Sequence, residues 1–149
     1  MEKRPGGRWL YPLLFSAQTL GAAILFLNTL PLYRRLVSDP GSWEVDPWDR
    51  AKWSIPAMIL IHIAYWTRYR LRPSLPNLEN ALVGHLVLFA SRLGFVLPTG
   101  LFSFLFIARR PEALGIPASG IALLLLGLFS MFCTAQEMDR WGKALLGRE

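Results

Sequence analysis

Long apolar runs separated by short charged segments constrain this sequence more than any other feature. The run "LYPLLFSAQTLGAAILFL" starts at Leu10, and three more apolar runs follow along the 149 residues. Hydrophobic residues make up 53% of the chain and charged residues only 17%, and the charges gather between the runs. A helix needs about 20 apolar residues to cross a hydrocarbon core. The pattern therefore predicts an integral membrane protein.

We expect an all-α fold, a polytopic membrane protein with four transmembrane helices packed as a bundle in a single domain, residues 1–149. The predicted spans cover residues 10–32, 53–71, 81–108 and 116–135. The first run follows a basic N-terminus, as in a signal peptide, but it is longer than a signal-peptide apolar region. We therefore interpret it as a retained first span.

Two segments at the membrane surface are predicted beside the second and fourth spans. The stretch "DPWD" is typical of a helix start, with Asp46 as the N-cap, Pro47 in the first helical position and Asp49 in the first turn. An interfacial helical segment should therefore precede the second span. The last segment, "EMDRWGKALLG" from Glu137, is short and amphipathic, and we expect it to lie on the membrane surface.

All six tryptophans lie at the ends of apolar runs or between them. Indole rings favour the headgroup level of a bilayer, so this distribution predicts interfacial anchors. The predicted anchors are Trp9, Trp43, Trp48, Trp53, Trp66 and Trp141.

Arg92 is the most informative polar residue, because it lies inside an apolar run. An arginine deep in a membrane must face protein or water. His85, Arg92 and Thr99 recur every seven residues and share one helix face, which we expect to point inward. Arg92 then binds an anion or lines an ion path, or it makes a structural salt bridge.

The chain offers few partners for such an arginine. Gln18, Asn28 and His62 are the polar candidates in other spans, and Glu137 is the only carboxylate close to a span. We expect Glu137 at the interface, paired with Arg140 or with one of the arginines at 68–72. An arginine without an internal acid indicates a contact outside the chain.

No metal or cofactor is predicted, although a haem b held by two histidines is an alternative. His62 and His85 lie on consecutive predicted helices, and they share a depth only in one register of the second span. A zinc site lacks its third and fourth ligands, and the single cysteine, Cys133, excludes an intrachain disulfide.

The motifs expected of an enzyme are missing, since no nucleophile–base set, paired carboxylates or phosphate-binding glycine loop is visible. The leading hypothesis is a non-catalytic accessory or assembly subunit of a larger membrane complex. A homo-oligomeric channel or transporter with a pathway along Arg92 is the first alternative, and a membrane enzyme or haem-binding electron carrier acting on a lipophilic substrate is the second. The expected partners are lipids with other membrane subunits or further copies of the chain, and no nucleic acid.

Charge also bears on orientation. The net charge of +6 fits basic residues that flank spans better than a nucleic-acid surface. Nine lysines and arginines fall on the side of the two termini and six on the other. By the positive-inside rule both termini are expected in the cytoplasm, with a bacterial cytoplasmic membrane as the default location.

Overall fold

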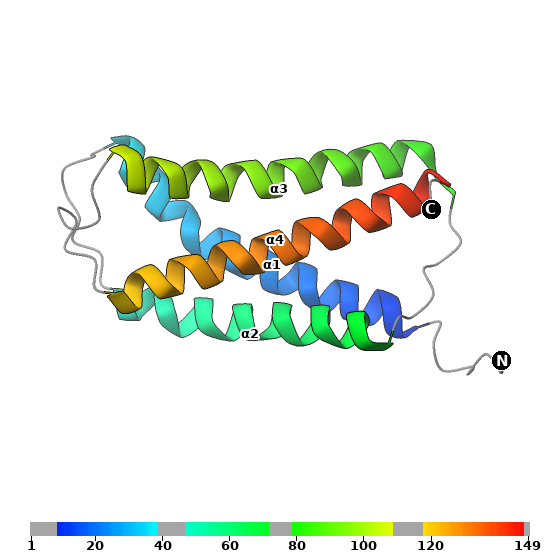
Figure 1. Ribbon diagram of the computed structural model, residues 1–149, viewed down its shortest axis with the longest axis horizontal. Helices are drawn as coiled ribbons and strands as arrows, with labels where there is room; N and C mark the ends of the chain where they lie inside the picture. Colours follow the sequence, from blue (N-terminus) through cyan, green and yellow to red (C-terminus); the bar gives the residue numbers. More distant parts are fainter. Residues whose placement is uncertain (1–8, 39–46, 72–78, 109–117, 148–149) are drawn as a thin grey trace.

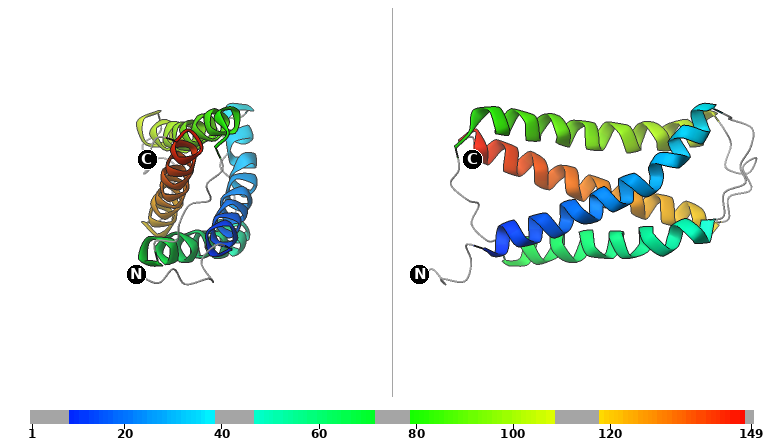
Figure 2. Two further views of the ribbon diagram at one scale, coloured as in Figure 1. Left: turned by 90° about the vertical axis from the view of Figure 1, so that its right-hand side faces the viewer. Right: turned by 180° about the vertical axis from the view of Figure 1, so that it is seen from behind.

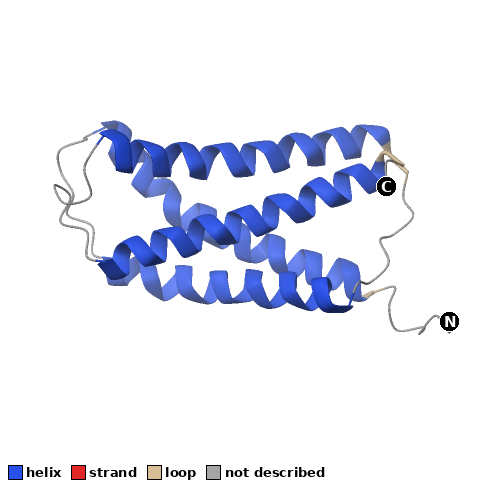
Figure 3. Ribbon diagram, viewed as in Figure 1, coloured by secondary structure: helices blue, strands red, loops and turns tan. Residues whose placement is uncertain are grey.

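The computed structural model describes residues 9–38, 47–71, 79–108 and 118–147, and these residues form four α-helices (Figure 1). In chain order the helices are α1 (Leu10–Ser38), α2 (Pro47–Leu71), α3 (Ala81–Ala108) and α4 (Ala118–Leu145). No strand occurs within the described ranges, as the colouring of Figure 3 shows. The predicted all-α fold is confirmed.

Helix α4 is the centre of the packing. α3 packs mainly on α4, α1 packs mainly on α2, and α4 also contacts α2 and α1. Seen end-on in Figure 2, α3 and α2 lie on opposite sides, with α4 and α1 between them. α1 begins and α4 ends at the same end of the molecule, referred to below as the terminal end (Figure 1). One side of α3 is therefore left without a neighbouring helix.

Three of the four helices are long and apolar enough to cross a membrane. The apolar stretches are Leu10–Pro31 in α1, Ala81–Gly100 in α3 and Ala118–Leu145 in α4. These three helices fit an integral membrane protein. The expectation that residues 53–71 form the second of four spans is not met, because α2 is not apolar enough to cross a membrane.

The composition of α2 explains the difference. Charged residues occupy its first turns, and Arg68 and Arg70 lie in its last turn. Only residues 53–67 are free of charge, and at ~1.5 Å per residue they cover about 22 Å of a hydrocarbon core of about 30 Å. α2 begins at Pro47, where the sequence predicts a helix start, while Asp46 lies outside the described residues. The predicted interfacial segment is thus continuous with the second helix.

Glycines bring the helices together at two points. A Cβ atom on Gly142 would lie 2.8 Å from Leu88 Cγ, and one on Gly84 would lie 2.9 Å from the Leu146 side chain. Between α1 and α2, a Cβ on Gly21 would lie 2.9 Å from Ile61. Small residues allow such close approach of helix backbones, which drives packing where lipid replaces water.

The predicted surface tail is instead the end of α4. The helix continues to Leu145 without interruption, and Glu137, Gly142 and Leu145 are buried. The Leu145 carbonyl accepts a hydrogen bond from the Asn80 backbone N–H at 3.1 Å, which ties the end of α4 to the start of α3. The amphipathic pattern was correct in period, but its buried side packs on protein rather than on lipid.

Candidate functional site

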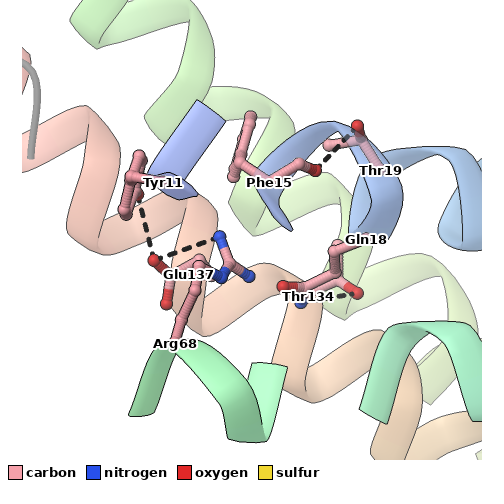
Figure 4. Close-up of polar contacts among 7 residues, drawn as sticks. All are labelled: Tyr11, Phe15, Gln18, Thr19, Arg68, Thr134 and Glu137. Atoms are coloured by element: carbon pink, nitrogen blue, oxygen red, sulfur yellow. Dashed lines mark hydrogen bonds and ion pairs between the residues drawn. The ribbon is translucent and has the colours of Figure 1, made fainter. Parts of the chain in front are cut away.

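The most unusual feature of the interior is a buried ion pair near the terminal end. Arg68 of α2 is 1% exposed and Glu137 of α4 is 6% exposed. Arg68 Nη1 lies 3.3 Å from Glu137 Oε1, and the Tyr11 hydroxyl of α1 donates a hydrogen bond of 3.0 Å to the same oxygen (Figure 4). The three side chains therefore join α1, α2 and α4 at one carboxylate, and we call them the buried triad.

The Arg68 guanidinium is held by charge rather than by directed hydrogen bonds. Its contact with Glu137 is close enough for an ion pair, yet none of its three nitrogens makes a hydrogen bond of good geometry to protein. The guanidinium carbon lies 5.6 Å from the centre of the Tyr11 ring and 5.7 Å from that of Phe15. Cation–π attraction of this kind is strengthened by desolvation, so the two rings partly replace the missing partners.

Further polar side chains lie on the same faces of α1 and α4, one or two turns away. Gln18 Nε2 donates to Thr134 Oγ1 at 3.3 Å, and the Trp141 ring packs on Phe15 with centres 4.7 Å apart. Gln18 Oε1 and Trp141 Nε1 are buried and make no hydrogen bond to any residue of the described ranges. Polar atoms thus gather in the half of the bundle nearest the terminal end.

The other half is apolar at its centre. Leu25, Ala57, Met58 and Ile61 form a buried cluster between α1 and α2, and Leu123 of α4 packs against it. Burying an incompletely paired charge costs free energy, whereas burying these side chains supplies it. The apolar cluster therefore stabilises the helix packing that keeps the triad away from water.

A cleft of about 380 Å³ opens between α2 and α4 beside the triad. Glu137 contributes to its lining, whereas its ion-pair partner Arg68 does not. The other lining residues are two tyrosines from α2 and four polar or charged residues from α4, namely Tyr65, Tyr69, Gln136, Asp139, Arg140 and Lys143.

The predicted stripe of α3 points away from the bundle. Arg92 and His85 are exposed, and no hydrogen bond or ion pair joins either one to any described residue. Thr99 donates to the Phe95 carbonyl of its own helix at 2.7 Å. The expected inward direction is therefore wrong. The side facing α4 carries Gly84 and Ser91, which also recur every seven residues and are buried, and Gly84 permits the close contact with Gly142 of α4.

The expected partners of Arg92 bind elsewhere. Gln18 pairs with Thr134, Asn28 Nδ2 donates to Ser54 Oγ at 2.7 Å, and His62 Nε2 lies 3.1 Å from Ser130 Oγ. Glu137 is buried in the triad and not at the interface, and the arginine paired with it is Arg68.

The tryptophans differ in their surroundings. Trp9, Trp53 and Trp66 are exposed, as interfacial anchors require, whereas Trp141 is partly buried against Phe15. Trp43 and the side chain of Trp48 lie outside the described residues.

The two histidines are not brought together. His62 lies on α2 opposite Ser130, while His85 lies on α3, on the other side of the bundle (Figure 2). Ser91 Oγ donates to the Ala135 carbonyl, which sets the register of α3 against α4 and places the histidines about 16 Å apart in depth at ~1.5 Å per residue. The described residues also contain no cluster of three or more metal-ligating side chains.

Arg68 and Tyr11 were missed as site residues, although the sequence carries a signal for Arg68. The buried side of α2 has small or apolar residues at the helical period, among them Ala57, Ile61 and Ala64, and Arg68 continues that series. From the charge pattern, Arg68 is expected only among the basic residues that flank the spans on the side of the two termini. Its position on the packed side distinguishes it from its exposed neighbour Arg70.

Comparison with protein-family models, with curated proteins and with solved structures gives no match to this chain.

Proposed function

We propose that this protein is a non-catalytic accessory or assembly subunit of a larger membrane complex, and that the outer side of α3 binds a partner's transmembrane helix through Arg92. One observation carries the proposal. Arg92 is exposed in the middle of the apolar stretch with the least protein cover, since 11% of the α3 stretch is buried against 22% for both α1 and α4.

The depth of Arg92 makes lipid a poor environment for it. Arg92 lies about 4 Å from the midpoint of α3, at ~1.5 Å per residue. In a hydrocarbon core about 30 Å thick, the nearer boundary is then about 11 Å away along the helix, which exceeds the length of an extended arginine side chain. An uncompensated arginine at this depth costs about 2.5–3.5 kcal/mol on insertion scales. A carboxylate on a neighbouring helix offsets part of that cost.

The described helices of a second copy of the chain do not offer that carboxylate. The only acidic residues in the four helices are Asp49, Glu137 and Asp139. Glu137 is paired with Arg68, Asp139 is paired with Lys143, and Asp49 lies in the first turn of α2, far from the middle of the bundle. The occupant proposed for this surface is therefore a span of a different protein that carries an aspartate or glutamate near mid-membrane.

Photo-crosslinking in the native membrane tests this assignment. A crosslinker at Phe89 or Val96, which are exposed one turn to either side of Arg92, should form an adduct with one protein whose span contains an acid at matching depth. A crosslinker at Leu13, exposed on α1, is the control and should capture mainly lipid. Arg92→Glu should abolish the adduct, and exchanging the partner's acid for arginine should restore it.

Two results would contradict the proposal. Adducts with lipid alone at both α3 positions would mean that no protein covers this side. An unchanged adduct in Arg92→Gln, with Arg70→Gln as the matched loss of an exposed charge, would mean that the arginine does not hold the partner.

A homo-oligomeric channel is the second candidate, and the outward direction of Arg92 limits where its pathway can lie. A pathway lined by Arg92 would have to lie between copies of the chain rather than inside one. In that case the α3 crosslinks join identical chains, and Arg92→Gln abolishes anion flux while the oligomer persists.

A further inference from the structure

The cleft between α2 and α4 has the chemistry of a site for an acceptor-rich group. Its donors are the Arg140 guanidinium, the Lys143 ammonium, the Gln136 amide and the hydroxyls of Tyr65 and Tyr69. Its acceptors are the carboxylates of Glu137 and Asp139, the Gln136 carbonyl and the same two hydroxyls. Both carboxylates are engaged in ion pairs, so the N–H donors of Arg140 are available to a ligand.

Ion pairs in and beside the cleft leave one positive charge without a partner. Glu137 is paired with the buried Arg68, and Asp139 is paired with Lys143 on the next turn of α4. Arg140 is exposed and makes no ion pair with any residue in the described part of the chain. A guanidinium can bind two oxygens of a phosphate through parallel hydrogen bonds, which makes phosphate a well-matched ligand.

The depth of the cleft in the membrane favours a lipid headgroup over free phosphate as the ligand. Arg140 and Lys143 lie about 13 Å and 17 Å from the midpoint of α4, at ~1.5 Å per residue. Half of a hydrocarbon core of about 30 Å is 15 Å, so the two cations lie on either side of its boundary. Glu137, at about 8 Å, lies deeper, on the side of the acyl chains.

The walls of the cleft suit the remainder of a lipid molecule. The Trp66 ring makes edge-to-face contacts with the rings of Tyr65 and Tyr69, whose centres lie 5.6 Å and 5.7 Å from its own. The three rings form an aromatic ridge along α2. Trp66 and Tyr69 are exposed. Aromatic rings with a polar tip favour the boundary between acyl chains and headgroups. Tyr65 and Tyr69, the members of this ridge that line the cleft, thus offer an aromatic wall beside the two cations.

From these observations we infer that the cleft between α2 and α4 binds an anionic phospholipid, with the phosphate on Arg140 and Lys143 and the upper acyl chain along Tyr65 and Tyr69. The site lies at the terminal end, the end that the basic residues of the sequence place in the cytoplasm, where anionic lipids are concentrated.

Lipid retention measured by native mass spectrometry tests the inference. The full chain is reconstituted in nanodiscs containing equal parts of phosphatidylglycerol and phosphatidylcholine, and the lipids that remain bound after release are counted. We expect phosphatidylglycerol to be retained preferentially, and Arg140→Gln to lower that preference about fivefold. Arg70→Gln, which removes an exposed charge outside the cleft at the same end, should leave it unchanged.

A second variant separates the cleft from general surface charge. Gln136 is exposed and lines the cleft, so Gln136→Trp fills the space without removing a charge and should also displace the lipid. Equal losses in Arg140→Gln and Arg70→Gln would overturn the inference, because the attraction would then belong to the whole surface. Displacement of the lipid by millimolar inorganic phosphate would also overturn it, because the site would then bind free phosphate.

Discussion

Removing one member of the buried ion pair should destabilise the fold far more than removing both. Arg68 and Glu137 are almost fully buried, and each is the other's only charged contact of opposite sign among the described residues. Breaking a buried pair on one side costs about 3–5 kcal/mol, because an unpaired charge is left without water. Replacing both members by apolar side chains of similar size is often neutral or stabilising.

The two single variants should also differ from each other. In Arg68→Met, the Glu137 carboxylate keeps its hydrogen bond from the Tyr11 hydroxyl. In Glu137→Leu, the guanidinium stays charged, because arginine does not lose its proton in proteins. It also has no directed hydrogen bond to replace the lost partner. Glu137→Leu is therefore expected at the upper end of the range, and Arg68→Met at the lower end.

The assay is a double-mutant cycle on the free energy of unfolding in mixed micelles, followed by far-ultraviolet circular dichroism. The double variant Arg68→Met/Glu137→Leu, combined with Tyr11→Phe so that no buried hydroxyl loses its acceptor, should unfold within about 1 kcal/mol of the original chain or be more stable. The pair Asp139–Lys143 is exposed and one turn apart, so Asp139→Asn serves as the matched control, with a cost below about 1 kcal/mol. A cost for Glu137→Leu no larger than that of the control would refute the burial of the pair.

Three further predictions concern single positions. Tyr11→Phe removes the hydroxyl that donates to Glu137 and should lower the free energy of unfolding by about 1.5–3 kcal/mol in the same assay, because the acceptor is charged. Gly142→Ala should destabilise the chain, since the new Cβ meets Leu88, whereas Gly94→Ala should be neutral or stabilising in thermal unfolding, because nothing lies within 4 Å of it. Cys133 is 2% exposed and should resist a maleimide reagent until the protein is denatured, as mass spectrometry would show; rapid labelling in the folded state would contradict its burial.

The number and type of the helices could be predicted from the sequence because both depend on local pattern. Apolar runs of sufficient length identify α1, α3 and α4, and the proline after Asp46 marks the start of α2. The range 81–108 matches α3, since its bounds follow from where the apolar pattern begins and ends. The end of α4 was missed because a polar last segment looks the same whether it packs on lipid or on protein.

The direction of a polar stripe could not be predicted, because periodicity gives a face but not its neighbour. On α3 two faces repeat every seven residues, one with His85 and Arg92 and the other with Gly84 and Ser91. The cost of an arginine in lipid favours turning the first face inward. The close contact between α3 and α4 at Gly84 and Gly142 requires the second face inward, and both conditions cannot be met within one chain.

Arg68 and Arg92 both carry a charge out of water, and the resulting free-energy cost is offset differently for each. Arg68 is neutralised inside the chain, by Glu137 and by two aromatic rings, and its presence fixes how α1, α2 and α4 meet. Arg92 lies on α3, whose main contacts are with α4. No acidic residue in the described part of the chain is available at the depth of Arg92. The Arg68–Glu137 pair lets the chain accommodate a buried arginine, whereas an unpaired charge at mid-membrane remains a cost to the isolated chain. That cost is offset once another molecule covers α3, and this difference is why we place Arg68 in the fold and propose Arg92 as a residue of assembly.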